Sequence, residues 1–77
     1  MDDSIVSDPE IMFGKPVIRG TRITVELILR KLAARMPISE ILLAHPHLTS
    51  DNIYAAAAYA AEYMSHGETL PITSQKT

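Results

Sequence analysis

The segment from Phe13 to Val25 places the tightest limit on the fold, because it holds two of the chain's three glycines and one proline. A short extended run, Val17-Ile18, leads into Gly20-Thr21, and the chain leaves through Ile23-Thr24. Glycine accepts the positive φ that the first central position of a type II′ turn requires. The sequence therefore predicts a β-hairpin whose two-residue turn is Gly20-Thr21.

Arg19 and Arg22 flank this turn, so the hairpin would project two guanidinium groups from a short, rigid arm. Such an arm suits contact with phosphate or with the edge of a nucleic-acid groove. A solvated hairpin whose arginines pair with nearby acids explains the same residues equally well. Both interpretations fit the segment.

The net charge of −2 conceals a strong asymmetry along the chain. Six of the seven basic residues fall within residues 15–35, whereas residues 1–14 and 36–77 are both net acidic. Such a distribution favours a positive patch that faces an anionic partner, although the acidic whole weakens non-specific attraction to DNA. The candidate contacts of this patch are Lys15, Arg19, Arg22, Arg30, Lys31 and Arg35.

At 77 residues the chain is near the lower size limit for a domain that folds alone. It contains no cysteine, so neither a disulfide nor a thiolate metal site can supplement its core. Self-association is the remaining common remedy, and we expect a homodimer or a higher homo-oligomer. No stretch approaches the ~20 apolar residues of a membrane span, and Asp2-Asp3 does not suit a signal peptide. We therefore expect a cytoplasmic protein that does not enter a membrane.

Residues 1–67 are expected to form one domain, in which a hairpin arm over residues 5–24 precedes three helices over residues 25–66. Thr24 is a suitable N-cap for the first helix, which should end near Arg35 because Pro37 forbids its continuation. Ser39 is the expected N-cap of a short second helix.

The third helix is expected to begin after Thr49 as its N-cap and to stop at Gly67. It is rich in alanine, the strongest helix former. Beyond it, residues 68–77 show no periodicity and are expected to be flexible. The predicted inward face of the helix consists of Ile53, Ala56, Ala57, Ala60 and Met64.

A short helix joined to a longer one by a tight connection is typical of a helix-turn-helix, in which the start of the longer helix enters the major groove. Three side chains at that start are candidate DNA contacts. Asn52 can pair with adenine, and Ser50 or Tyr54 can reach phosphate. The helix carries no Lys or Arg, however, and capping and core packing explain its residues without DNA.

Neither metal binding nor catalysis is indicated by the remaining residues. His45 and His47 flank Pro46, but the chain offers only His66 as a further histidine. A helix terminus followed by a loop explains the pair more simply. No nucleophile lies beside a base, and no glycine-rich phosphate loop is present. We therefore expect no enzyme, no metal and no cofactor.

Three stretches of the chain follow the pattern of a known family. They read Gly-Lys-Pro-Val-Ile-Arg-Gly-Thr-Arg-Ile-Thr-Val at residues 14–25, Ile-Ser-Glu-Ile-Leu at 38–42 and Pro-His-Leu-Thr at 46–49. On these residues, and on Ile5 and Asp8-Pro9 before them, the chain resembles the domain of unknown function 433 family, which is related to VapB-type antitoxins. The resemblance covers about residues 5–64. It implies a small β-element followed by a three-helix, homeodomain-like helix-turn-helix, so that the fold is mainly α.

The resemblance also implies a prokaryotic operon neighbour, often a PIN-like ribonuclease toxin, that the protein would neutralise. The chain departs from the family pattern at Arg35-Met36-Pro37, where members usually carry a glycine. In the third helix, alanine and tyrosine largely replace the acids typical of the family.

Two hypotheses follow. The leading one is a DNA-binding antitoxin or small transcriptional regulator of a toxin–antitoxin operon, which acts as a dimer. The alternative is a protein-interaction module that neutralises a PIN-like toxin, or self-assembles, without binding DNA. Its support is the acidic balance of the chain and the third helix without Lys or Arg.

Overall fold

The computed structural model describes residues 4–66. Its elements, in chain order, are β1 (Ile5–Val6), a 3-10 turn η1 (Met12–Gly14), β2 (Val17–Ile18), α1 (Val25–Ala33), α2 (Ile38–Ala44) and α3 (Ser50–His66). This part of the chain is mainly helical, with three helices and a small two-stranded sheet, which is consistent with a small helix-turn-helix fold and confirms the predicted fold class. The predicted stop at Gly67 and the predicted tail lie outside the described residues.

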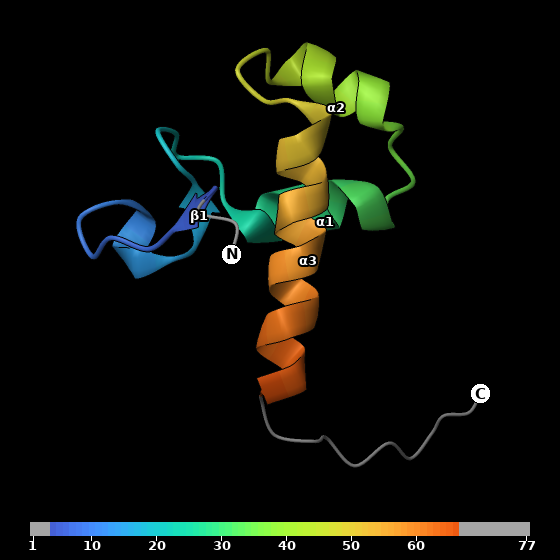
Figure 1. Ribbon diagram of the computed structural model, residues 1–77. Coiled ribbons are helices and arrows are strands. Elements are labelled where there is room, and N and C mark those ends of the chain that lie inside the picture. Colours follow the sequence, from blue (N-terminus) through green and yellow to red (C-terminus); the bar gives the residue numbers. More distant parts are fainter. Residues whose placement is uncertain (1–3, 67–77) are drawn as a thin grey trace.

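The three helices and the sheet meet around the first half of α3 (Figure 1). α1 crosses α3, α2 lies beside the first turns of α3, and the sheet lies to one side. The last turns of α3 extend past all other described elements. None of the helices within residues 4–66 combines the length and the apolar character that crossing a membrane requires.

β2 pairs with two segments of the chain. β1 is its antiparallel partner, with Ile5 opposite Ile18 and Val6 opposite Val17. On its other side, a single bridge joins Val17 to Thr24. The chain therefore turns back after β2 as the sequence predicts, but the regular ladder is made with β1.

The turn after β2 is centred on Arg19 and Gly20, not on Gly20 and Thr21 as predicted. The amide of Thr21 donates to the carbonyl of Ile18 at 2.9 Å, which closes a four-residue turn. Gly20 occupies its third position with φ 81°, the value that a type II turn requires there. The hydroxyl of Thr21 also donates to Ile18 at 2.8 Å and accepts from the amide of Ile23 at 3.0 Å, so this side chain fixes the exit from the turn.

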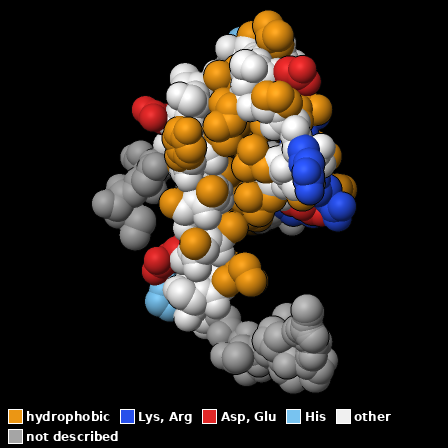
Figure 2. All heavy atoms as spheres, turned by 90° about the vertical axis from the view of Figure 1, so that its right-hand side faces the viewer, with side chains coloured by type: hydrophobic (Ala, Val, Ile, Leu, Met, Phe, Trp, Pro, Cys, Tyr) orange, Lys and Arg blue, Asp and Glu red, His pale blue; other side chains and the backbone are white. Residues whose placement is uncertain are grey.

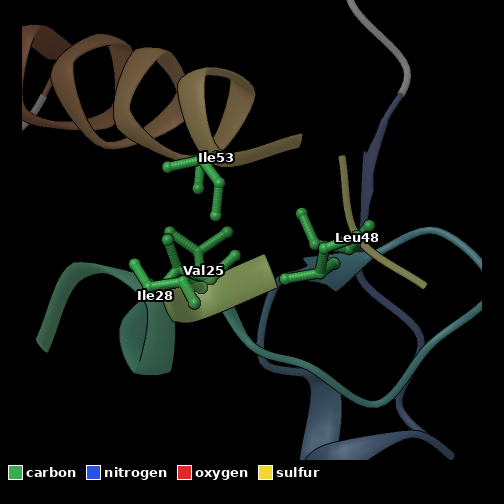
Figure 3. Packing of buried hydrophobic residues seen from close by; sticks show 7 residues of the cluster. Val25, Ile28, Leu48 and Ile53 are labelled. Carbon is green, nitrogen blue, oxygen red and sulfur yellow. The ribbon is translucent and has the colours of Figure 1, made fainter. Parts of the chain in front are cut away.

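The core consists of one fully buried isoleucine from each helix, packed together with a residue of the sheet. Ile28 of α1, Ile41 of α2 and Ile53 of α3 are fully buried. Ile18 of β2 and Leu48, which precedes α3, belong to the same cluster. In Figure 3, Ile53 points from α3 toward Ile28 of α1. β2 is thus part of the packed body.

α1 begins as predicted and ends earlier than predicted. The hydroxyl of Thr24 accepts the amide of Leu27 at 3.0 Å, which confirms Thr24 as the N-cap. The helix ends at Ala33. The amide of Arg35 then donates back to the carbonyl of Leu32 at 2.9 Å, and the next amide returns to Lys31 at 3.0 Å. These two bonds define a Schellman motif in which Arg35 takes the left-handed position, with φ 68°, that glycine usually fills.

Ser39 is not the N-cap of α2. The helix begins at Ile38, and Pro37 precedes it as an N-cap without a side-chain hydrogen bond. The carbonyl of Pro37 accepts the amides of Glu40 and Ile41 at 2.9 and 3.1 Å. Because the ring of Pro37 fixes φ near −62° and its ψ of 148° is extended, proline satisfies the geometry of a cap, and Ser39 already lies in the first turn.

α3 packs against the body from its start to Ala60, with Tyr59 and Ala60 only half-buried. Ile53, Ala55 and Ala56 are its buried residues. Ala57 and Met64, which were predicted to face inward, are exposed, and the side chain of Met64 is 73% accessible. The predicted inward face was therefore wrong at Ala57 and Met64, whereas Ala60 is half-buried beside α1.

Replacing Arg35 with glycine is expected to raise the free energy of unfolding by about 1 kcal/mol. A left-handed conformation costs an L-residue roughly 1–2 kcal/mol, and the greater freedom of glycine in the unfolded chain offsets part of that gain. Urea denaturation measures the difference. Ala34→Gly is the matched control, because φ there is −82° and glycine should only destabilise. Equal effects at the two positions would contradict strain at Arg35.

Candidate functional site

The six basic residues predicted to form one patch do not lie together. The turn that carries Arg19 and Arg22 and the connection that carries Arg35 lie on opposite sides of α3 in Figure 1. Arg22 and Arg35 are exposed, whereas Lys31 of α1 is half-buried. The positive charge of this part of the chain is therefore not gathered in one patch, and two of its groups flank α3.

Lys15 and Arg30 share a single carboxylate. The Nζ atom of Lys15 lies 3.3 Å from Oε1 of Glu26, and Nη2 of Arg30 lies 3.0 Å from Oε2. Hydrogen bonds from Arg30 and then from Lys15 hold the pKa of the Glu26 carboxyl below its usual value. This cluster carries one net positive charge instead of two, and both cations are already engaged by an acid.

The start of α3 is held by a reciprocal cap. The hydroxyl of Thr49 accepts the amide of Asn52 at 3.2 Å, and the side-chain oxygen of Asn52 accepts the amide of Thr49 at 3.0 Å. This is a capping box with asparagine in the place of Glu or Gln. Ser50 and Tyr54 are exposed beside it, with Tyr54 at 61%. Of the three predicted contacts on this helix, two face solvent and Asn52 supports the helix.

Residues 45–49 connect α2 to α3 as a fixed turn. The amide of His45 donates to Ile41 at 2.9 Å, and the amide of Leu48 donates to His45 at 2.9 Å. The buried side chain of Leu48 then anchors the connection in the core. The Nε2 atom of His45 is buried without a hydrogen-bond partner in the described part of the chain. No three His, Cys, Asp or Glu side chains within residues 4–66 gather as a metal site would require.

An open apolar groove lies between α1 and the projecting end of α3. Its volume is about 620 Å³. Tyr59 and Tyr63 stack along it with ring centroids 6.3 Å apart. Figure 2 shows apolar side chains over this face, with Lys and Arg side chains beside them. The lining residues are Pro16, Val25, Glu26, Leu29, Arg30, Ala33, Tyr59, Ala60, Tyr63 and Met64.

Sequence reasoning missed this groove, although each of its walls has a helical signal. Val25, Leu29 and Ala33 recur at intervals of four residues in α1, and Tyr59 and Tyr63 do so in α3. Each stripe alone indicates a packed face. Only the crossing of the two helices shows that the stripes border an open space.

A second apolar feature lies in η1. Phe13 is 95% exposed. Its backbone and that of Met12 are left-handed, with φ values of 60° and 51°, and Gly14 follows at 84°. Left-handed backbone is costly for both non-glycine residues, so the turn holds an aromatic ring in solvent at the expense of strain.

Fold and site together define a small helix-turn-helix-like domain with a two-stranded N-terminal sheet, an exposed helix start and an apolar groove. Residues 5–60 match the family described as "Protein of unknown function (DUF433)". The chain belongs to this family. The match ends inside α3, so Tyr63 and Met64 lie beyond it.

One relative is the "Uncharacterized protein y4eO" of Sinorhizobium fredii (strain NBRC 101917 / NGR234). It is 38% identical over 56 residues, which cover 73% of this chain and 25% of the relative. The chain thus spans about a quarter of the length of that protein. No solved structure matches the chain.

Replacing Asn52 with alanine is expected to lower the free energy of unfolding by about 1 kcal/mol, since the amide of Thr49 loses its acceptor. Urea denaturation followed by circular dichroism checks the value. Asn52→Asp should cost much less, because a carboxylate keeps the acceptor and suits the positive end of the helix dipole. An unchanged stability of the alanine variant would contradict the capping role.

Proposed function

We propose that this protein is a small cytoplasmic DNA-binding regulator of the antitoxin type, which contacts DNA through α2, α3 and the basic turn after β2. The observation that carries the proposal is the unit formed by α2 and α3. A short helix is joined by an anchored connection to a longer helix that is capped and exposed at its start. In helix-turn-helix proteins, the corresponding helix start enters the major groove.

The division of positive charge supports this use. A major groove about 12 Å wide is bordered by two phosphate backbones, and a protein that inserts a helix meets one on each side. The turn that carries Arg19 and Arg22 lies on one side of α3, and the connection from α1 to α2, which carries Arg35, lies on the other. In the proposed complex, each group would contact one of the two backbones.

Affinity would then come mainly from phosphate, with little base reading. α3 carries no Lys or Arg, and the side-chain oxygen of Asn52 is used by the cap. Ser50 and Tyr54 remain as short polar contacts. Binding of this kind is weak for a single copy, depends steeply on salt and rises when two copies bind together.

A protein-interaction function without DNA is the second candidate, and Phe13 favours it. An aromatic ring that is almost wholly exposed on strained backbone is the kind of side chain that anchors protein interfaces. The partner of this function would be the PIN-like ribonuclease that the family resemblance implies, encoded beside this gene.

Arg22→Ala is expected to weaken binding to all DNA sequences alike and to lower the slope of log affinity against log salt by about 0.9, the value for one lost phosphate contact. Fluorescence anisotropy on the promoter of the protein's own operon, at several salt concentrations, measures the slope. Lys15→Ala is the control and should change the slope less, because Lys15 is engaged by Glu26. No binding by the unaltered protein at low salt would overturn DNA binding.

Phe13→Ala is expected to abolish co-purification with the product of the adjacent gene while the melting temperature stays within a few degrees, because the side chain makes little intrachain contact. Leu43→Ala is the matched control, since this leucine is also exposed, at 80%, but lies on α2. Retention of the partner by the Phe13 variant would argue against η1 as its anchor.

A further inference from the structure

We propose that a second copy of this chain covers the apolar groove between α1 and α3, by seating the end of its own α3 there in a two-fold symmetric pair. The proposal does not depend on DNA binding. It concerns a surface that the proposed function leaves unused, and it assigns that surface a partner.

The end of α3, residues 61–66, is exposed along its whole length. Beyond the half-buried Tyr59 and Ala60 the helix continues for about 9 Å, at 1.5 Å per residue. Tyr63 and Met64 are 69% and 73% exposed there. An isolated helix of this length is marginal in water even when it is rich in alanine, because most helical stability comes from packing. The exposed residues are large and apolar, so a packed partner would stabilise this segment most.

The surface is complementary to itself. A two-fold interface requires one patch that holds both halves of the contact. Here Leu29 and Ala33 of α1 form a wall of the groove, while Met64 projects from α3 beside it. When two such patches meet, the α3 end of each copy fills the groove of the other. A partner that filled the groove but had no groove of its own would leave the projecting end of α3 uncovered.

Small residues allow the two helices to approach closely. Ala57, Ala60 and Met64 follow the spacing i, i+3 and i+7, which places them on one stripe of α3. Helix axes come closest where side chains at the contact are small. An antiparallel pair of α3 ends would meet along this stripe, with Ala60 near the symmetry axis.

Charged groups lie outside the proposed contact stripe. The groove margin holds Lys15 and Arg30 with Glu26 as their one carboxylate, which leaves an excess of one positive charge. The end of α3 holds Glu62, paired with His66 at 2.8 Å. Figure 2 shows acidic and histidine side chains at this end of the helix, away from the Lys and Arg side chains. Glu62 stands two residues from Ala60 and from Met64, so it lies off the contact stripe and stays in solvent in the pair.

The first test is mass in solution. Sedimentation equilibrium of the full chain should give twice 8.5 kDa at micromolar concentration. Met64→Glu should weaken the dimer at least about tenfold, because it places a charge in an apolar contact. Leu43 of α2 is exposed to a similar degree, and Leu43→Glu should leave the dimer affinity unchanged. Circular dichroism confirms that each variant stays folded.

The second test locates the symmetry axis. The chain has no native cysteine, so Ala60→Cys introduces a single thiol. Mild oxidation should link two copies of this variant, whereas Ala58→Cys should not link, because residues two apart do not share a helix face. A monomer at micromolar concentration would overturn the proposal and would indicate another occupant, such as a different protein or the chain's own residues 67–77. A dimer that survives Met64→Glu and does not cross-link through Ala60→Cys would overturn it as well.

Discussion

The contact of Ile28, Ile41 and Ile53 is the interaction on which the rest of the structure depends. It is the place where all three helices touch, and β2 joins the same cluster through Ile18. Burying one such side chain contributes roughly 1.5–3 kcal/mol, while a typical domain is stable by only about 5–15 kcal/mol. In a core this small, each isoleucine supplies a large share of the free energy of unfolding. Its packing also determines the angle at which two helices cross. The relative placement of α2 and α3, and hence any use of them as a helix-turn-helix, follows from this contact.

Concentrating the core at one end of α3 gives the helix two different parts. Its start is buried on one side, capped by Thr49 and Asn52, and exposed beside the α2 connection. Its end leaves the core and borders the groove with Tyr63 and Met64. DNA binding would use the first part and self-association the second. One helix could therefore link the two activities rigidly, because a dimer formed through its end would set the spacing of the two starts.

Local signals in the sequence predicted what is local in the fold. Thr24 caps α1 because its hydroxyl reaches an amide three residues away, and such a contact needs no tertiary information. The error at Ser39 arose because proline can serve as a cap through its backbone alone. The outward position of Met64 was missed because a helix so rich in alanine has almost no apolar periodicity. The neutralisation of Lys15 by Glu26 joins residues 11 apart across a loop, so only the folded chain reveals it.

The reciprocal Thr49–Asn52 bonds also bear on the order in which the molecule folds. They join residues three apart, and a loop of that size closes at little entropic cost. With alanine following them, we expect α3 to gain helical structure early, before the pairing of β1 with β2, whose partners Ile5 and Ile18 are distant in sequence. Yet α3 is the last of the three described helices to be synthesised. During synthesis on the ribosome, Ile28 and Ile41 therefore stay exposed until Ile53 emerges. The core can pack only then, when α3, the helix that forms most readily, is available.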